Sequence, residues 1–230
     1  LVLFFFQIYI KGDVMMRAVI FDMDGVIIDS EPIHLEIAYQ VSKKIGITCL
    51  KKDFEKFIGV SNKAMWEELI DKFKFEKNID EILKIHREMT FSIFREKDLK
   101  EINGIKELLE SLRENNLPCA VASSSPLELI EIIIEKLDIK KYMRYYISGE
   151  SLSKSKPNPM IFFKVAQKLK VKPQECLVIE DSKHGVQAAK RAGMQCIGFI
   201  NPNSGNQDLS KADYICNDIK ELSYSKIKYI

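Results

Sequence analysis

Short apolar runs alternate with helical patterns along most of this chain. The expected strands cover residues 17–21, 119–122, 145–148, 176–179, 195–200 and 214–216. Amphipathic patterns of helical period lie between the later runs, at residues 105–115, 126–137, 159–169 and 183–192. Strands that alternate with helices pair in parallel, so the pattern predicts an α/β fold with a doubly wound parallel sheet. In such sheets, ligands bind beyond the carboxyl ends of the strands.

One long segment interrupts this alternation, because residues 33–100 contain no convincing strand. Helical patterns cover 33–44, 62–73 and 80–96, and Ser61 is placed to cap the second. We interpret the segment as a helical cap domain, 31–102, inserted into a core made of residues 16–30 and 103–230. Short links near 29–31 and 101–103 would join the two parts. Four aromatic residues are expected in the core of the cap: Trp66, Phe73, Phe91 and Phe94.

The first residues of the chain are apolar, which raises the question of a membrane segment. Residues 1–10 are too few to span a bilayer, follow no basic region and show no small-residue cleavage site. We therefore expect no membrane association. We also expect residues 1–15 to be a leader, with Met15 or Met16 as the native start.

Composition narrows the class of protein further. With 46% hydrophobic residues, 30% charged residues and a net charge of +2 in 230 residues, the chain resembles an ordinary globular protein. Such a balance does not predict nucleic-acid binding. The five cysteines are widely spaced and form no C-x-x-C pair, and four of them lie in expected strands. We read them as buried thiols of a cytoplasmic protein, and we expect a monomer.

Two carboxylates follow the first strand directly. Asp22 and Asp24 are two residues apart, so in an extended segment both side chains point to the same side. Gly25 would provide the sharp turn that follows. Two adjacent anions raise each other's pKa unless a cation joins them, and Mg²⁺ prefers oxygen ligands. Alone, a D-x-D pair is a weak signal, since many such pairs cap helices or lie in solvated loops.

The ends of later strands carry residues that suit a phosphate group. Ser123 follows "CAVA", Lys156 lies in "SKPNP", and Glu180, Asp181 and Ser182 follow "CLVI". Each has another explanation: a serine of a turn, a solvated charge, and a carboxylate that caps a helix. The coincidence at four places along one sheet edge favours phosphate chemistry instead.

In combination these motifs resemble a known family. The ordered set "DMDGVIIDSEP", "VASSS", "KPNP" and "VIEDSKHGVQAAKRAG" is similar to the haloacid dehalogenase-like hydrolase superfamily, in the group of beta-phosphoglucomutase and small sugar-phosphate phosphatases. The resemblance extends over residues 16–200. It implies a Rossmann-like core with a helical cap inserted after the first motif. A dehalogenase proper is disfavoured, because its first motif lacks the second aspartate.

The resemblance also implies catalytic roles. Asp22 would attack phosphorus and become an aspartyl phosphate, while Asp24 would act as general acid and then as general base. Ser123 and Lys156 would bind the oxygens of the transferred phosphoryl group.

A metal site follows from the same resemblance. Mg²⁺ would be held by Asp22, by the backbone carbonyl of Asp24 and by Asp181, with Glu180 nearby.

Substrate selection is expected to involve the cap together with Ser124. His34 occupies the place of a histidine that contacts the acid/base aspartate in mutase relatives, although an exposed polar residue explains it equally well. Those mutases carry an arginine after the serine of "FIGVSNKAM", where this chain has Asn62 with Lys63 beside it. A neutral amide cannot form the charged bidentate contact, so we favour hydrolysis of a small phosphorylated metabolite, with a sugar phosphate as the expected substrate.

Two alternatives belong to other classes. A beta-phosphoglucomutase-type isomerase could use Lys63 in place of the missing arginine. A receiver-type signalling domain also places aspartates, a hydroxyl and a lysine around Mg²⁺. Receivers have neither a long insert after the first strand nor a need for the second aspartate, which makes this reading the weaker one.

Overall fold

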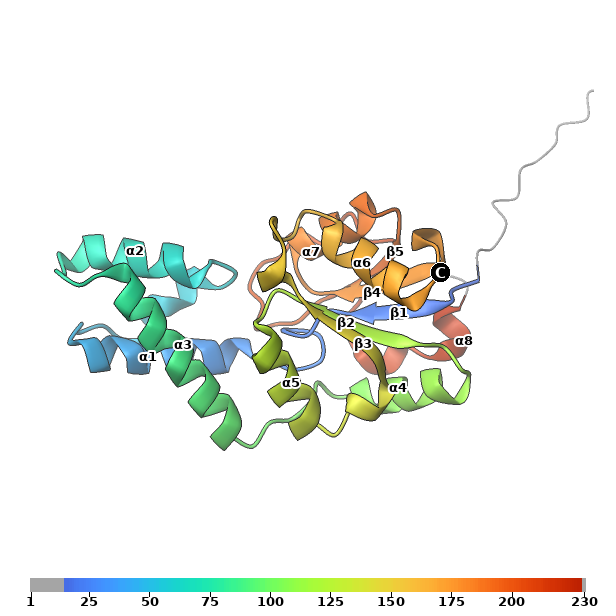
Figure 1. Cartoon of the computed structure of the whole chain (residues 1–230), viewed down its shortest axis with the longest axis horizontal. Helices are drawn as coiled ribbons and strands as arrows, with labels where there is room; N and C mark the ends of the chain where they lie inside the picture. Colours follow the sequence, from blue (N-terminus) through green and yellow to red (C-terminus); the bar gives the residue numbers. More distant parts are fainter. Residues whose placement is uncertain (1–14, 229–230) are drawn as a thin grey trace, which may run out of the picture.

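A parallel sheet forms the centre of the larger part of the molecule (Figure 1). The structure is a computed structural model that describes residues 15–228. The strands are β1 (Ala18–Phe21), β2 (Cys119–Ser123), β3 (Met143–Ser148), β4 (Cys176–Glu180), β5 (Gln195–Phe199) and β6 (Tyr214–Cys216). Their order is β3-β2-β1-β4-β5-β6, and every neighbouring pair is parallel. The predicted Rossmann-like sheet is confirmed, and β1 lies at the point where the strand order reverses.

Helices cover both faces of the sheet because the central strands β1, β2 and β4 are buried on both sides. Val19 and Phe21 of β1 pack on the layer of α4 (Ile105–Glu114), α5 (Leu127–Lys136) and α8 (Tyr224–Ile227). Ala18 and Ile20 belong to the opposite core, with α6 (Met160–Leu169) and α7 (Lys183–Arg191). Burial on both faces explains why the strands appear as continuous apolar runs rather than as alternating patterns.

Strand β3 begins two residues before its predicted start. It lies at one edge of the sheet, and its pairing with β2 shifts between two neighbouring positions, Cys119 with Met143 and Ala120 with Tyr145. Arg144 is therefore the extra residue of a β-bulge. A charged residue inside the run obscures the apolar pattern from which the strand was predicted.

The helical insert is present as predicted and lies beyond one end of the sheet (Figure 1). It consists of α1 (Glu31–Ile45), the 3₁₀ helix η1 (Lys51–Phe57), α2 (Asn62–Phe73) and α3 (Ile79–Glu96). Ser61 caps α2, its hydroxyl accepting from the Ala64 N–H at 3.3 Å, as expected. Shorter 3₁₀ turns elsewhere are η2 (Lys140–Tyr142), η3 (Gly149–Ser151), η4 (Pro173–Glu175) and η5 (Ile219–Glu221).

The aromatic core of the cap differs from the prediction at one residue. Trp66 and Phe94 are fully buried, and Phe91 is nearly so. Phe73 is 36% exposed, so its predicted place in this core is wrong. As the last residue of α2, it lies beside the ammonium of Lys72, whose Nζ is 5.1 Å from the ring centroid.

The two links between cap and core are paired with each other. Ile28 and Glu101 form an antiparallel bridge, and the Ile102 N–H donates to the Ile27 carbonyl at 2.8 Å. The links thus form one short ribbon. The exact residue boundaries predicted for the core and the cap stay a prediction.

Ion pairs on the surface also connect helix α3 to the core. Arg87 pairs with Glu150 at 2.5 Å, and Arg95 pairs with Glu128. Lys136 donates from α5 to the carbonyls that end α3 and follow it, those of Arg95 and Lys97, both at 2.6 Å. These contacts hold the cap in the orientation seen in Figure 1.

The predicted leader and the membrane question concern the chain's start. Residues 1–14 lie outside the described part of the chain. Within residues 15–228, no helix combines the length and the hydropathy that crossing a membrane requires.

A histidine is buried in the core of the cap. His86 is 2% exposed, and its Nδ1 accepts from the indole N–H of Trp66 at 3.1 Å. Its Nε2 finds no hydrogen-bond partner among the described residues. Burial first, and then the charge of nearby His34, lower the pKa of His86 to about 4. The folded cap therefore holds this imidazole neutral.

We predict that His86 makes the protein less stable in weak acid. Between pH 6.5 and pH 4 the unfolded chain binds a proton that the folded chain refuses, so the free energy of unfolding falls as pH falls. From pH 7.5 to pH 5 the loss should be about 2 kcal/mol larger in the wild type than in His86→Gln, measured by urea denaturation. His184→Gln, at an exposed position, is the control and should keep the wild-type slope. Equal slopes in wild type and His86→Gln would contradict the prediction.

Candidate active site

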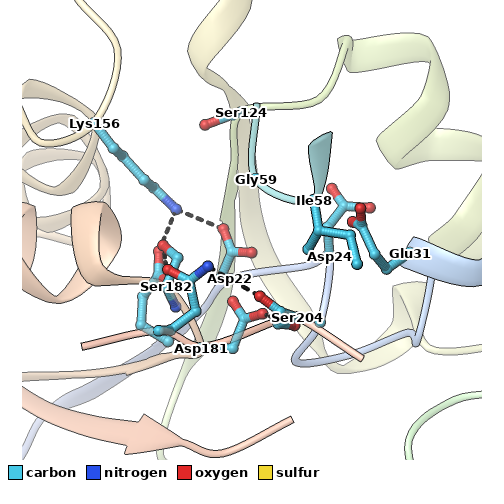
Figure 2. Close-up of a pocket in the computed structure, with 13 residues that line it drawn as sticks. Asp22, Asp24, Glu31, Ile58, Gly59, Ser124, Lys156, Asp181, Ser182 and Ser204 are labelled. Carbon is cyan, nitrogen blue, oxygen red and sulfur yellow. Dashed lines mark hydrogen bonds and ion pairs between the residues drawn. The ribbon is translucent and has the colours of Figure 1, made fainter. Parts of the chain in front are cut away.

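A pocket of about 240 Å³ opens at the carboxyl ends of β1 and β4, facing the cap (Figure 2). The core contributes Asp22, Ser124, Lys156 and Asp181 among others, while Ile58 and Gly59 come from the loop after η1. The pocket is therefore at the switch point of the sheet, and the cap forms part of its wall.

Lys156 is the centre of the hydrogen bonding in this pocket. Its Nζ lies 2.5 Å from Oδ1 of Asp22 (Figure 2). It also lies 2.7 Å from Oε1 of Glu180 and 3.0 Å from the carbonyl of Ala122. The lysine side chain is only 7% exposed. Burial favours its neutral form, but the charges of Asp22 and Glu180 outweigh burial and raise the pKa of Lys156. The ammonium thus joins the ends of three neighbouring strands.

Three carboxylates converge on one point beside this lysine. One oxygen from each of Asp22, Glu180 and Asp181 lies within 4.8 Å of the other two. Burial is the main cause that raises the pKa of Asp22 well above its ordinary value; the charge of Lys156 offsets this only in part. Burial and the charge of Glu180 raise the pKa of Asp181 to about 7, although Ser204 donates to it.

This donor set fits a divalent cation. Three buried carboxylates face a single lysine, so the cluster carries an excess of negative charge, and its ligand atoms are all hard oxygens. Mg²⁺ would remove the repulsion that burial intensifies.

Two glycines allow the carboxylates to approach the backbone. Gly25 has a φ of +79°, and a Cβ there would lie 1.9 Å from Oδ2 of Asp181. A Cβ on Gly185 of α7 would lie 1.7 Å from Oε1 of Glu180. Asn201 holds the turn at Gly25 by donating to its carbonyl at 3.0 Å. The predicted turn at Gly25 is present, whereas nothing in the sequence singled out Gly185.

Asp24 points away from the carboxylate cluster, so the expected convergence of Asp22 and Asp24 on one point is wrong. Both line the same pocket, but the chain bends at Met23, and the two-residue period of a strand no longer holds beyond it. Oδ1 of Asp24 accepts from Ser30 at 2.7 Å, and Oδ2 accepts from Ser125 at 2.7 Å.

Further donors complete the surroundings of Asp24. Ser123 donates to Oδ2 at 3.2 Å, and Nε2 of His34 lies 3.7 Å from Oδ1. Burial would raise the pKa of Asp24, but His34 and the serine hydroxyls lower it to about 2. Burial acts to lower the pKa of His34, yet Asp24 raises it.

The cap residues predicted from the sequence lie differently. Asn62 and Lys63 are exposed at the start of α2, and neither lines the pocket. Lys63 faces Glu67 one turn along the helix, at 3.8 Å. Ile58 and Gly59, earlier in the same segment, line the pocket instead.

Sequence reasoning missed several serines of the site. Ser30 and Ser125 belong to the quoted motifs "DSEP" and "SSS", so their hydroxyls were a visible signal that was not used. Ser182 donates from its N–H and its hydroxyl to Glu180, at 3.1 and 3.0 Å. Ser204 lies in the loop after β5, where no local pattern marks it.

Comparison with known proteins agrees with this geometry. The profile of the haloacid dehalogenase-like hydrolase family matches residues 19–199, which include every strand end that lines the pocket. The chain belongs to this family. Its central parallel sheet and its inserted cap are those of a haloacid dehalogenase-like hydrolase.

Relatives within the family carry two kinds of name. A phosphorylated carbohydrates phosphatase from Thermotoga maritima is 32% identical over 216 residues, covering 90% of this chain and 100% of the relative. A beta-phosphoglucomutase from Bacillus subtilis is 30% identical, covering 90% of this chain and 92% of the relative. Among solved structures, a beta-phosphoglucomutase from Clostridium difficile superposes with a TM-score of 0.74 at 28% identity, covering 94% of this chain and 97% of that one.

We predict that Lys156→Met destabilises the protein strongly at pH 8 in EDTA. The substitution leaves Asp22 and Glu180 buried without their cation, which costs about 3 to 5 kcal/mol in the free energy of unfolding. The loss should shrink towards pH 5.5, because carboxylates with raised pKa values bind protons in the folded state and so recover stability as pH falls.

Lys190→Met provides the matched control for this prediction. Lys190 pairs with Asp213 at 2.5 Å, but both side chains are about a third exposed. Its loss should cost less than about 1 kcal/mol. Urea denaturation that shows equal stabilities for Lys156→Met and Lys190→Met would contradict the importance of the buried pair.

Proposed function

We propose that this chain is a Mg²⁺-dependent phosphatase that hydrolyses a small phosphorylated metabolite, most suitably a sugar phosphate, through an aspartyl phosphate. The observation that carries the proposal is the position of Asp22 in the pocket. Its carboxylate accepts from the ammonium of Lys156 and belongs to the acidic cluster with Glu180 and Asp181, at the switch point of the sheet. An anionic group that enters the pocket meets a nucleophile, a cation and the hydroxyl of Ser124 at once.

In the first half of the proposed reaction, Lys156 and the Ser123–Ser124 turn bind the phosphoryl oxygens. An oxygen of Asp22 attacks phosphorus, and the bond between phosphorus and the ester oxygen breaks. Asp24 acts here in its protonated form, which its low pKa makes the minor one in the free protein, and gives this proton to the departing alcohol. The bend at Met23 places Asp24 outside the acidic cluster. This proton carrier is therefore kept apart from the nucleophile.

In the second half, water replaces the alcohol. Asp24, now a carboxylate, takes a proton from water, and the resulting hydroxide attacks phosphorus. The bond between phosphorus and the Asp22 oxygen breaks, so inorganic phosphate leaves and Asp22 is restored. The hydrogen bonds from Ser30, Ser125 and His34 suit this step, because they stabilise the carboxylate form of Asp24.

Mg²⁺ would be held by Asp22, by Asp181 and by the backbone carbonyl of Asp24, with Glu180 nearby. When bound, it supplies positive charge that offsets the charge of the phosphoryl group. The excess negative charge of the cluster supports this assignment.

Hydrolysis is favoured over isomerisation by what the cap presents to the pocket. A mutase must hold a second phosphate while its intermediate reorients, but of the cap residues that line the pocket Ile58 and Gly59 are uncharged and Glu31 is acidic. Asn62 is neutral, and Lys63 is exposed beside Glu67. The isomerase remains the second candidate, since a beta-phosphoglucomutase is among the relatives. For that reaction, Lys63 would bind the second phosphate of the intermediate.

We also propose that the enzyme acts as a cytoplasmic monomer on a free small molecule. The cysteines support a reducing compartment, because all five are free, and four are buried. The name of the Thermotoga maritima relative supports a phosphorylated carbohydrate as substrate.

The first test is phosphate release from a panel of sugar and nucleotide monophosphates. We expect turnover with Mg²⁺, none in EDTA, and inhibition by Ca²⁺, which prefers more and looser ligands. Asp22→Asn is nearly isosteric and should fold like the wild type while losing turnover and any acid-labile phosphoprotein. Substantial turnover by this variant, with deamidation excluded by mass spectrometry, would show that water attacks phosphorus directly.

A second test separates hydrolase from mutase. We expect release of phosphate from several substrates and little conversion of beta-glucose 1-phosphate to glucose 6-phosphate, even with glucose 1,6-bisphosphate as primer. Asn62→Arg should shift the products modestly towards the isomer, because a charge-assisted contact is worth about 1.5 to 3 kcal/mol when partly desolvated.

Lys63→Gln is the matched variant for the isomerase alternative. If the wild type interconverts the glucose phosphates faster than it releases phosphate, and Lys63→Gln abolishes this, the mutase reading is correct. If Lys63→Gln leaves the ratio of phosphate to isomer unchanged and phosphate dominates, hydrolysis is supported.

A further inference from the structure

A second and larger hollow, of about 680 Å³, lies at the amino ends of β2 and β3. The turn from α4 into β2, which forms part of its wall, is at the end of the sheet away from the cap (Figure 1). We call it the basic hollow, and its cationic rim consists of Arg113, Lys141, Arg144, Lys168 and Lys170. The basic hollow is separate from the candidate active site, because the two share no lining residue.

The positive charge of this rim is balanced only in part, because the nearby carboxylates are Asp138, which pairs with Lys141, and Glu110, which accepts from the hydroxyl of Tyr142 at 2.9 Å. Lys141 pairs with Asp138 at 2.5 Å, but within residues 15–228 none of the other four rim cations forms an ion pair with a carboxylate. No Asp or Glu is among the described residues that line the hollow. In a chain with a net charge of only +2, such a concentration of cations creates a local positive potential.

Helix dipoles account for part of the rim only. Arg113 and Lys168 lie in the last turns of α4 and α6, where the helix dipole favours a cation. Arg144 has no such explanation, because it is the bulge residue of β3. A bulge re-aims side chains, and here the bulge residue is a cation that lines the hollow.

The rim and floor together indicate the chemistry of a ligand. Pro118, Met143 and Leu169 are half-buried and give the hollow an apolar floor. Arg113 and Lys141 lie over the ring of Tyr142, 5.2 and 5.4 Å from its centroid, which restrains both cations at the rim. The volume is in the range of sites for small organic ligands, about 300 to 1,000 Å³.

We propose that the basic hollow binds a nucleoside di- or triphosphate, with the phosphates at the cationic rim and the base on the apolar floor. Several adjacent phosphates match several unpaired cations better than one phosphate does. The proposal concerns binding alone, with no chemical reaction of the nucleotide in this hollow. The only lining thiol, Cys119, is 2% exposed, and burial raises its pKa to about 12.

Equilibrium binding of ATP by calorimetry, in EDTA so that no turnover occurs, tests the proposal. Arg144→Gln with Lys170→Gln should weaken ATP binding at least tenfold. Lys84→Gln with Lys164→Gln is the matched control, since it removes the same charge from exposed positions outside the hollow and should leave the affinity unchanged. Equal affinities of the two double variants would overturn the proposal, and so would absence of ATP binding by the wild type. Equal urea midpoints establish that both variants are folded.

Two further ligands test the assigned chemistry. AMP should bind at least tenfold more weakly than ATP, because it offers one phosphate to the rim. Inorganic tripolyphosphate should also bind more weakly, since it makes no use of the floor; equal binding would replace the nucleotide with an inorganic polyphosphate and overturn the assignment. Binding of a single-stranded RNA that depends on Arg144 and Lys170 and that ATP does not displace would likewise overturn it. None of these measurements requires phosphatase activity, so their outcome is separate from that of the proposed function.

Discussion

A buried lysine that must be paired with carboxylates determines the architecture of this site. Lys156 is almost inaccessible to solvent, so its charge is stable only where anions surround it. Asp22 and Glu180 provide those anions from the ends of β1 and β4, which are neighbours only because the strand order reverses at β1. Asp181 then adds a negative charge that the lysine does not neutralise. The fold thereby places three carboxylates beside one lysine, so negative charge remains that a second cation could balance.

Two aspartates only two residues apart are assigned different tasks in this site, Asp22 as the nucleophile and Asp24 as the proton carrier. Asp22 faces the lysine and the acidic cluster, while Asp24 faces hydroxyls from Ser30, Ser123 and Ser125. The bend at Met23 and the left-handed Gly25 produce this divergence. Two chemically identical side chains thus experience opposite surroundings, and their pKa values are shifted in opposite directions.

Much of this arrangement could be predicted from the sequence, because the strands are short apolar runs with chemistry-bearing residues at their ends. Parallel pairing then places Asp22, Ser123 and Asp181 on one edge without further information. The bend at Met23 was not predictable, since a two-residue period was assumed to continue beyond the strand. The exposure of Phe73 also escaped prediction, because helical periodicity does not tell how far a helix end extends past its core.

The remaining misses concern contacts between distant segments. Ser204 reaches Asp181 from a loop whose own sequence carries no pattern, and only the folded sheet brings the two together. The roles of Asn62 and Lys63 stay a prediction, but neither residue lines the pocket in this orientation of the cap, which depends on its links and surface contacts. Ile58 and Gly59 line the pocket because of that orientation. Local patterns contain no information about it.

The paired links between core and cap have a consequence for how ligands enter. Because Ile28 bridges Glu101 and the Ile102 N–H donates to the Ile27 carbonyl, the two crossings of the chain lie side by side, and a rotation of the cap would use them as one hinge. The contacts that oppose such a rotation include solvent-exposed ion pairs such as Arg87 with Glu150, each worth about 1 kcal/mol or less and weakened by salt, and the hydrogen bonds from Lys136 to the end of α3. Higher ionic strength therefore weakens part of what holds the cap over the pocket.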